Sequence, residues 1–232
     1  MLETITFAPP RELLGDRAYA QIRRDIILCR LPPALALTEA GMAEHYRMGL
    51  APIRSALSRL VQERLVNVVP RRGYTVAPIT IQGIRDAFEL RLLLEPAVAR
   101  AAVGRVDPSK LRSFLSGPYG DESAARDLEL LEENRSFHLC IAEAAGNERM
   151  TQILAALLDE MMRLLHFGLF SRRDLHRVPI DYDLQLQQHA ALVEAIAEGD
   201  RDRAETIARS HVELARTSVM SAVHAGAIDP LA

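Results

Sequence analysis

The pattern of apolar residues changes near Pro78, and this change restricts the folds open to the chain. Before Pro78, short helical segments precede two runs rich in β-branched residues, at 65–69 and 74–77. After Pro78, apolar residues recur at intervals of three and four positions, and no strand pattern follows. We therefore expect two domains, residues 1–78 and residues 79–232, which a chain of 232 residues is long enough to form.

The first 78 residues carry the pattern of three helices and a hairpin. A helix at 16–30 ends at two prolines, and a second helix begins after Thr38, a favourable N-cap residue, and runs to about Tyr46. A break at Gly49 precedes the third helix. Its apolar face comprises Ile53, Ala56, Leu57 and Leu60. The two strands are joined by a Pro-Arg-Arg-Gly turn at 70–73, and this order of elements predicts a winged helix-turn-helix.

The net charge of the whole chain is −3, which by itself indicates neither a nucleic acid nor a membrane as a partner. The charge is uneven, because residues 1–78 contain eleven arginines and seven acidic residues, a charge of +4 that leaves −7 for the remainder. This asymmetry is typical of a nucleic-acid-binding domain joined to another module, although a chance fluctuation accounts for it equally well. Arg54 on the third helix, with Arg71 and Arg72 at the hairpin turn, is expected to contact DNA. The alternative for each arginine is a salt bridge at the surface.

Residues 79–232 predict about six helices in an antiparallel bundle, so the fold class of the whole chain is mainly α. Breaks between the helices fall at residues 107–108, 117–120, 146–147, 171–179 and 199–200. Gly146 and Gly199 suit the left-handed conformation that ends a helix, and Asn147 and Asp200 suit the N-cap of the helix that follows.

Neither the cysteine content nor the hydropathy indicates an extracellular or membrane protein. Cys29 and Cys140 are too few and too far apart for a disulfide framework. The N-terminal residues lack the apolar stretch of a signal peptide, and the longest apolar run, at 153–158, is too short to span a bilayer. We expect a soluble cytoplasmic protein without a membrane partner.

The motifs, taken in order, resemble those of the GntR family of bacterial transcription regulators. In residues 1–78 the resemblance rests on YAQIR at 19–23, LPP at 31–33, LTE at 37–39, MAE at 42–44, PIRSAL at 52–57 and PRRGY at 70–74. The remainder is similar to the FCD type of effector domain, named after the C-terminal domain of FadR, through ELR at 89–91, NRSFH at 134–138, AAGN at 144–147, GD at 199–200, and His189 and His211. The resemblance covers nearly the whole chain and implies a ligand-responsive regulator that binds operator DNA as a homodimer.

The start of the third helix departs from the family's pattern. The family usually has a small hydroxyl residue, an arginine and a threonine at the positions that are Gly49, Leu50 and Ala51 here. Arg54 is then the main polar side chain of this helix, while Leu50 and Ala51 offer apolar contact, for instance to a thymine methyl group. The wing contributes Arg71, Arg72 and Gly73 to the expected DNA contacts. The family's operator sequences are not expected to transfer, and an oligomeric regulator with weakened direct DNA reading is a further hypothesis.

Four residues of the second domain form a candidate metal site. Asn134 and His138 are four positions apart and so lie on one face of a helix, while His189 and His211 fall on the last two predicted helices. Three imidazoles favour Zn²⁺ or another late transition metal such as Ni²⁺ over Mg²⁺, with Mn²⁺ as an alternative. The resemblance implies the same four positions as metal ligands, although the family often has aspartate in place of Asn134. The alternative for each histidine is a place in the core or at the surface, hydrogen-bonded to a neighbour, and His45, His166, His176 and His224, which lack partners at ligand spacing, are expected to be structural or solvent-exposed.

Neutral ligands would leave the charge of a divalent ion uncompensated. The ion would then attract an anion, and we expect a small carboxylate effector whose far end Arg91 holds through a bidentate pair. The alternative for Arg91 is an ion pair with Glu95, four positions later. A metal-dependent hydrolase is the alternative function. It lacks a well-placed general base, Glu143 being one turn beyond His138, so an enzyme is not expected.

Overall fold

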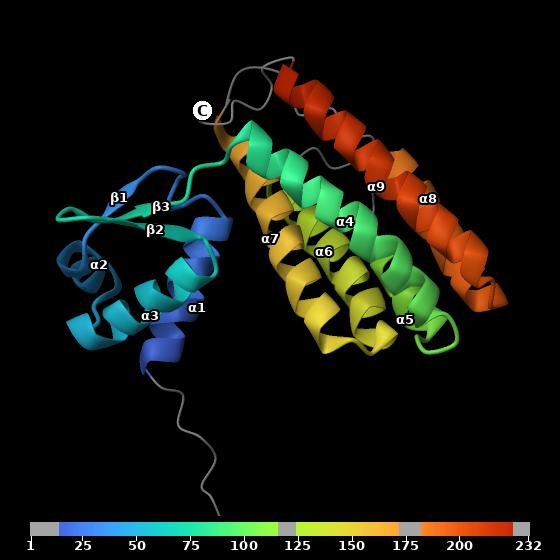
Figure 1. Cartoon of the computed structure of the whole chain (residues 1–232), viewed down its shortest axis with the longest axis horizontal. Helices are drawn as coiled ribbons and strands as arrows, with labels where there is room; N and C mark the ends of the chain where they lie inside the picture. The colour runs from blue at the N-terminus through green and yellow to red at the C-terminus, as the bar shows by residue number, and fades with distance from the viewer. Residues whose placement is uncertain (1–13, 116–123, 172–181, 225–232) are drawn as a thin grey trace, which may run out of the picture. The chain divides into compact units, whose positions relative to one another are not determined.

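The computed structural model of the chain describes residues 14–115, 124–171 and 182–224. Its contacts divide the chain into two compact units, Met1–Pro78 and Ile79–Ala232. Among the described residues, the first unit contains helices and three strands, and the second contains helices without strands (Figure 1). Each unit has its own apolar core, so each is described separately.

Three helices form the body of the first unit: α1 (Leu14–Ile27), α2 (Glu39–Tyr46) and α3 (Leu50–Gln62). α1 packs against α3, and Ile22 of α1 is fully buried in one cluster with Ile53 and Leu57 of α3. Thr38 caps α2, because its Oγ1 accepts a hydrogen bond from the Gly41 amide at 3.1 Å. The structure confirms the predicted helices and this cap.

The wing is an antiparallel sheet of three strands, β1 (Ala36–Leu37), β2 (Val66–Val69) and β3 (Gly73–Val76), in the order β1-β3-β2. The hairpin of β2 and β3, in which Val69 pairs with Gly73, confirms the predicted wing. β1 was not predicted, because two residues are too few to give an alternating pattern. It pairs Leu37 with Tyr74 and so joins the segment before α2 to the wing.

The second unit contains α4 (Ile81–Ala102), α5 (Pro108–Arg112), α6 (Ala124–Ala145), α7 (Glu148–Ser171), α8 (Tyr182–Glu198) and α9 (Arg201–His224), with the short 3₁₀ helix η1 (Ser113–Leu115) after α5. These six α-helices of the described residues agree with the number predicted. The predicted break at 117–120 lies outside the described residues. So do residues 172–179 of the predicted break at 171–179.

The predicted helix ends at 146–147 and 199–200 are confirmed by the backbone. Gly146 and Gly199 have φ angles of +76° and +79°, the left-handed conformation that glycine adopts without strain. The side chains of Asn147 and Asp200 each accept a hydrogen bond from a backbone amide three residues later, at 3.2 and 2.9 Å. Both residues therefore cap the helices that follow them.

α4 holds the second unit together. It packs against α6, α7 and α9, while α8 packs against α9 and α5. Inward-facing side chains of α4, α6, α8 and α9 therefore meet in the interior, where the candidate site lies. None of the described helices combines the length and the apolar composition needed to cross a membrane.

Replacing Gly73 by alanine should destabilise the first unit. Gly73 has a φ of +99°, a conformation that costs other residues about 1–3 kcal/mol. In addition, a Cβ at this position would lie 2.7 Å from the carbonyl oxygen of Leu37. Urea unfolding followed by circular dichroism should therefore show a lower midpoint for Gly73→Ala.

The matched control is Gly15→Ala, in the first turn of α1. There the nearest atom to an added Cβ is Oγ of Ser55 at 3.5 Å, an ordinary contact. Alanine also restricts the unfolded chain more than glycine does, so the midpoint should stay unchanged or rise. Equal midpoints for the two variants would contradict this account of the wing.

Candidate metal centre

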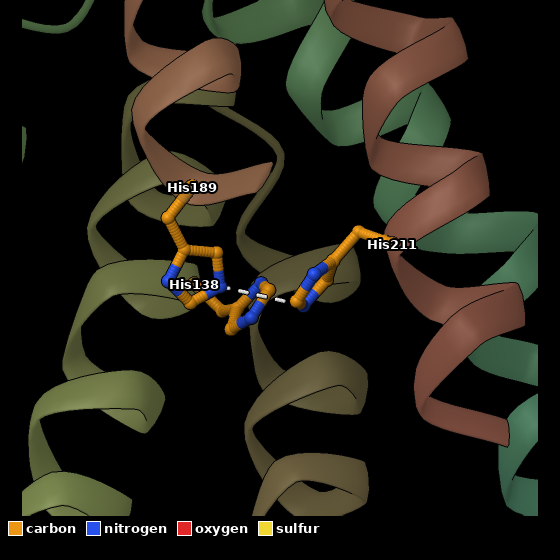
Figure 2. Close-up of side chains that lie close together, drawn as sticks. All are labelled: His138, His189 and His211. Carbon is orange, nitrogen blue, oxygen red and sulfur yellow. Dashed lines mark hydrogen bonds between the residues drawn. The ribbon is translucent and has the colours of Figure 1, made fainter. Parts of the chain in front are cut away.

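Three buried histidines from three helices converge inside the second unit (Figure 2). They are His138 of α6, His189 of α8 and His211 of α9, and one ring nitrogen of each lies within 4.8 Å of those of the other two. Nε2 of His189 and Nε2 of His211 are 3.3 Å apart. The structure therefore brings together the three histidines that the sequence singled out.

The helix turn at Gly199 brings two of these histidines face to face. His189 lies ten positions before Gly199 and His211 twelve positions after it, and α8 packs against α9 on either side of this turn. Two residues at nearly equal distances from the turn of a helical hairpin lie opposite each other. The ring of Phe137 stacks on His189 with 4.2 Å between ring centres, which restrains the orientation of that imidazole.

Hydrogen bonds fix the tautomers of the other two imidazoles. Nδ1 of His138 lies 2.9 Å from Oε2 of Glu95, and Nδ1 of His211 lies 3.0 Å from Oε1 of Gln188. Both oxygens are acceptors, so each Nδ1–H donates. Nε2 of each of these rings is thereby available as a ligand atom, in the arrangement usual for metal-binding histidines.

Burial keeps two of the imidazoles neutral. It lowers the pKa of His211 to about 3, and the neighbouring His138 adds to the effect. Burial also lowers the pKa of His189 well below its usual value, and His211 and His138 reinforce that shift. Both rings are therefore unprotonated at pH 7, the form in which imidazole binds a metal.

The distance between two of the ring nitrogens suits a tetrahedral metal ion. Zinc–nitrogen bonds of 2.0–2.1 Å put two ligand atoms roughly 3.3 Å apart, which is the separation of Nε2 between His189 and His211. Nε2 of His138 is buried and has no hydrogen-bond partner among the described residues. A buried nitrogen without a partner is costly, and a metal ion would satisfy it. The residues present therefore fit a divalent ion of the zinc type.

Asn134, the fourth predicted ligand, borders the same cavity as His189 and His211. It lies one turn before His138 on α6. Its Oδ1 is buried and, like Nε2 of His138, has no hydrogen-bond partner in the part of the chain that the structure describes. The amide oxygen is thus available to a ligand in the cavity.

Arg91 forms the ion pair that was the alternative to effector binding. It is buried, and its Nε donates to Oε1 of Glu95 at 2.5 Å, while the other oxygen of Glu95 accepts from His138. Burial alone would raise the pKa of Glu95, but Arg91 and His138 outweigh it and hold the pKa well below its usual range. Arg91 also lines the cavity, so its guanidinium is connected through Glu95 to the histidine cluster.

The cavity beside the histidines has a volume of about 70 Å³. Its lining includes Arg91, Asn134, His189 and His211, and apolar side chains from α4, α6, α7 and α9. A cavity with convergent polar groups and histidines of perturbed pKa in its lining is a candidate small-molecule binding site.

Two residues of this site were missed at the level of sequence. Glu95 was considered only as a partner of Arg91, although a carboxylate within an apolar stretch of a helix is a signal of further pairing. Gln188 adjoins His189 in the chain but bonds His211, and nothing in the residue pattern indicates this contact. Glu143, the candidate general base of a hydrolase, is exposed.

The other histidines of the described residues lie outside the cluster. His45 and His224 are exposed, and His166 is fully buried. His176 lies outside the described residues.

The residues expected at DNA lie on α3 and at the turn of the wing. Nε and Nη2 of Arg54 donate to the carboxylate of Glu39 at 3.1 and 2.7 Å, so Arg54, although 65 % exposed, forms the surface salt bridge considered as its alternative. This contact holds the pKa of Glu39 below its usual range. Arg71 and Arg72 are exposed at the turn and have no ion pair in the described part of the chain.

The first turn of α3 is apolar and exposed. Leu50 retains 49 % of its accessible surface, and Ala51 beside it is exposed. Gly49, the N-cap residue of α3, contributes no side-chain hydrogen bond. Gly73 lies at the start of β3, where its positive φ allows the chain to leave the turn of the wing.

Comparison with known proteins gives matches for both units. Residues 14–76 match the family model of the bacterial regulatory proteins, gntR family, and residues 86–214, more than half of the chain, match that of the FCD domain. The HTH-type transcriptional repressor GlaR of Escherichia coli (strain K12) is 29 % identical over 203 residues, which span 84 % of this chain and 90 % of that protein. The HTH-type transcriptional repressor RspR of the same organism is 23 % identical over 90 % of each chain.

Among solved structures, E. coli McbR/YncC aligns with a TM-score of 0.72 over 90 % of this chain and 98 % of that one, at 19 % identity. At this identity the likeness establishes the fold alone. The family matches go further, because they cover the helix-turn-helix and the helical unit in order and belong to regulators rather than enzymes. The chain therefore belongs to the GntR family of bacterial transcription regulators with an FCD domain, and it is a DNA-binding transcriptional regulator.

Proposed function

We propose that this regulator binds operator DNA as a homodimer in the cytoplasm, carries a divalent metal ion in residues 79–232, its FCD-type domain, and responds to a small carboxylate bound beside that ion. The observation that carries the proposal is the convergence of three buried histidines, at metal-ligand spacing, next to a cavity. Residues 1–78 are the DNA-binding domain in this proposal.

The metal ligands are His138, His189, His211 and Asn134. Three imidazoles favour Zn²⁺, with Ni²⁺ and Mn²⁺ as the alternatives. Support for Asn134 comes from its buried Oδ1, which has no partner among the described residues and lies one helical turn from His138. The ion, when bound, supplies positive charge and an open coordination position at the end of the cavity.

The effector is an anion because the four ligands are neutral when they bind a metal. Glu95 compensates part of the ion's charge, but it is shared with Arg91. Since Nε of Arg91 is bonded to Glu95, a terminal guanidinium nitrogen is left to donate to a carboxylate in the cavity. We therefore assign Arg91 to the end of the effector nearest the metal, rather than to the far end expected from the sequence.

The DNA contacts of this proposal combine α3 with the wing. Arg71 and Arg72 bind phosphates, an assignment supported by their exposure at the turn that Gly73 closes. Arg54 reads a base edge when it exchanges Glu39 for DNA. Leu50 and Ala51 make apolar contacts in the major groove, where a thymine methyl is the complementary group.

Dimerisation is part of this proposal because the charge of the DNA-binding unit is modest. A net charge of +4 over residues 1–78 gives one winged helix limited attraction for phosphate. Two linked copies that bind two half-sites gain affinity through effective concentration. In this proposal the dimer has two arrangements that differ in DNA affinity. An effector that binds one arrangement more tightly than the other changes the affinity for DNA, and DNA changes the affinity for the effector by the same coupling free energy.

Zinc should stabilise the protein through His189. Binding at a concentration 100-fold above the dissociation constant stabilises the folded state by about 2.7 kcal/mol, which raises the melting temperature by several degrees. Differential scanning calorimetry should show this rise for the unaltered chain and lose it for His189→Ala. His45→Ala, an exposed histidine of the first unit, should retain it. An equal rise in all three proteins would contradict a metal site at the cluster.

Glu95→Gln should weaken zinc binding by about 10- to 100-fold, because the amide no longer provides a charged acceptor for Nδ1–H of His138. Competition with a chromogenic chelator measures this affinity. Glu89→Gln, an exposed acid on the same helix, is the matched control and should bind zinc as the unaltered chain does. Equal affinities for both variants would remove Glu95 from the metal site.

Arg72→Ala and Arg54→Ala should each lower DNA affinity about tenfold, and loss of the phosphate contact at Arg72 should reduce the salt dependence by about one counterion per site. Fluorescence anisotropy with a genomic fragment selected by the full chain measures both quantities. Arg209→Ala, an exposed arginine of α9, is the control. Unchanged binding in both test variants would show that the winged helix does not read DNA as described. Absence of specific binding at every salt concentration, with and without zinc, would reject the proposed function.

A further inference from the structure

The turn between α2 and α3 holds an arginine in a backbone conformation that suits glycine. Arg47 is the C-cap residue of α2, and its φ of 53° and ψ of 44° lie in the left-handed region. Its amide donates to the carbonyl oxygen of Glu44 at 3.2 Å, and this bond ends the helix. Glycine adopts this conformation freely, whereas a residue with a Cβ adopts it under strain. Strained backbone of this kind is found most often at binding sites.

The side chain of Arg47 is exposed to solvent. Among the described residues it forms no ion pair or hydrogen bond, although Glu44 lies one turn before it on α2. Arg54 of α3, by contrast, is bonded to Glu39. The guanidinium of Arg47 is therefore a positive charge available to a partner outside the chain.

Arg47 lies three positions before Leu50, the first residue of α3. A helix-turn-helix binds DNA with the start of its second helix in the major groove, so the residues just before that start face the phosphates at the edge of the groove. Residues 48–53 contain no side chain with a strong hydrogen-bond donor. Arg47 is thus the donor that precedes the apolar first turn of α3, and Arg54 is the next one along the chain.

We propose that Arg47 binds a DNA phosphate at the start of α3 and so takes the place of the polar side chains that the first turn of this helix lacks. The inference rests on the proposed DNA contacts of α3 and adds a residue to them. A phosphate is the partner, rather than a base edge, because Arg47 precedes the helix that enters the groove. The contact adds affinity without sequence preference, and it fixes the position of α3 on the duplex.

Arg64 provides a matched control within the same unit. It is exposed, its φ of 59° is also left-handed, and it follows the end of α3 as Arg47 follows the end of α2. Its side chain likewise forms no ion pair or hydrogen bond in the part of the chain that the structure describes. Gln62, the last residue of α3, lies roughly 18 Å along the helix axis from Leu50, so Arg64 is remote from the proposed phosphate.

Arg47→Gly should lower DNA affinity about tenfold. Fluorescence anisotropy of the full chain measures the affinity for the genomic fragment that it selects and for an unrelated fragment of equal length. Because the lost contact is to a phosphate, both affinities should fall by a similar factor, and the salt dependence should decrease by about one counterion per site. Arg47→Lys keeps the positive charge and should stay within about threefold of the unaltered chain. Arg64→Gly should bind within about twofold.

Urea unfolding followed by circular dichroism separates a lost contact from a damaged fold. Glycine is unstrained in the left-handed conformation, so the midpoints of Arg47→Gly and Arg64→Gly should equal or exceed that of the unaltered chain. A loss of DNA affinity without a loss of stability, in Arg47→Gly alone, is the expected result. A lower midpoint for Arg47→Gly would assign the arginine a structural role and overturn the inference.

The outcomes also separate the inference from the proposed function. If Arg47→Gly and Arg64→Gly bind DNA equally well, Arg47 does not contact a phosphate, and the contacts proposed for Arg54 and Arg72 stand on their own variants. If Arg47→Gly weakens binding to the selected fragment alone, the contact is to a base and the phosphate is rejected. If the unaltered chain binds no fragment specifically, the proposed function fails and the inference with it.

Discussion

The buried carboxylate of Glu95 is the group on which the interior of the FCD domain depends. One oxygen accepts from Arg91 and the other from His138, at 2.5 and 2.9 Å. A carboxylate removed from water is tolerated only when such partners satisfy it, and each partner would in turn be left unsatisfied without it. Because Arg91 and Glu95 belong to α4 and His138 to α6, these bonds also fix how the two helices face each other. The position of His138 in the candidate metal centre is thus a consequence of the same contact.

Local structure could be predicted from sequence to a large extent, because its causes lie within a few residues. Thr38 caps α2 through an amide three positions away, and Gly146 and Gly199 end helices through their own backbone conformation. β1 could not be predicted in this way. Its two residues are extended because they pair with β3, almost forty positions later, and such a pairing leaves no periodic pattern in the chain.

At the candidate site, too, some features could be predicted from sequence and contacts between distant residues could not. His138, His189 and His211 could be predicted from their spacing on helices and from the resemblance to a family, and the structure brings them together. The partners that orient them could not, since Glu95 and Gln188 meet their histidines across helices. Arg54 shows that a tertiary contact can also change the role expected of a surface residue. Its guanidinium is bonded to Glu39, fifteen positions away, which periodicity does not reveal.

α4 connects this site to the DNA-binding unit through the covalent chain. It carries Arg91 and Glu95 and begins at Ile81, and residues 77–80 alone separate it from the end of β3 at Val76. Within this segment, Pro78 restricts the backbone of the residue before it, Ala77. In the proposed regulator, any signal carried along the chain from the cavity to the wing has to pass through these four residues.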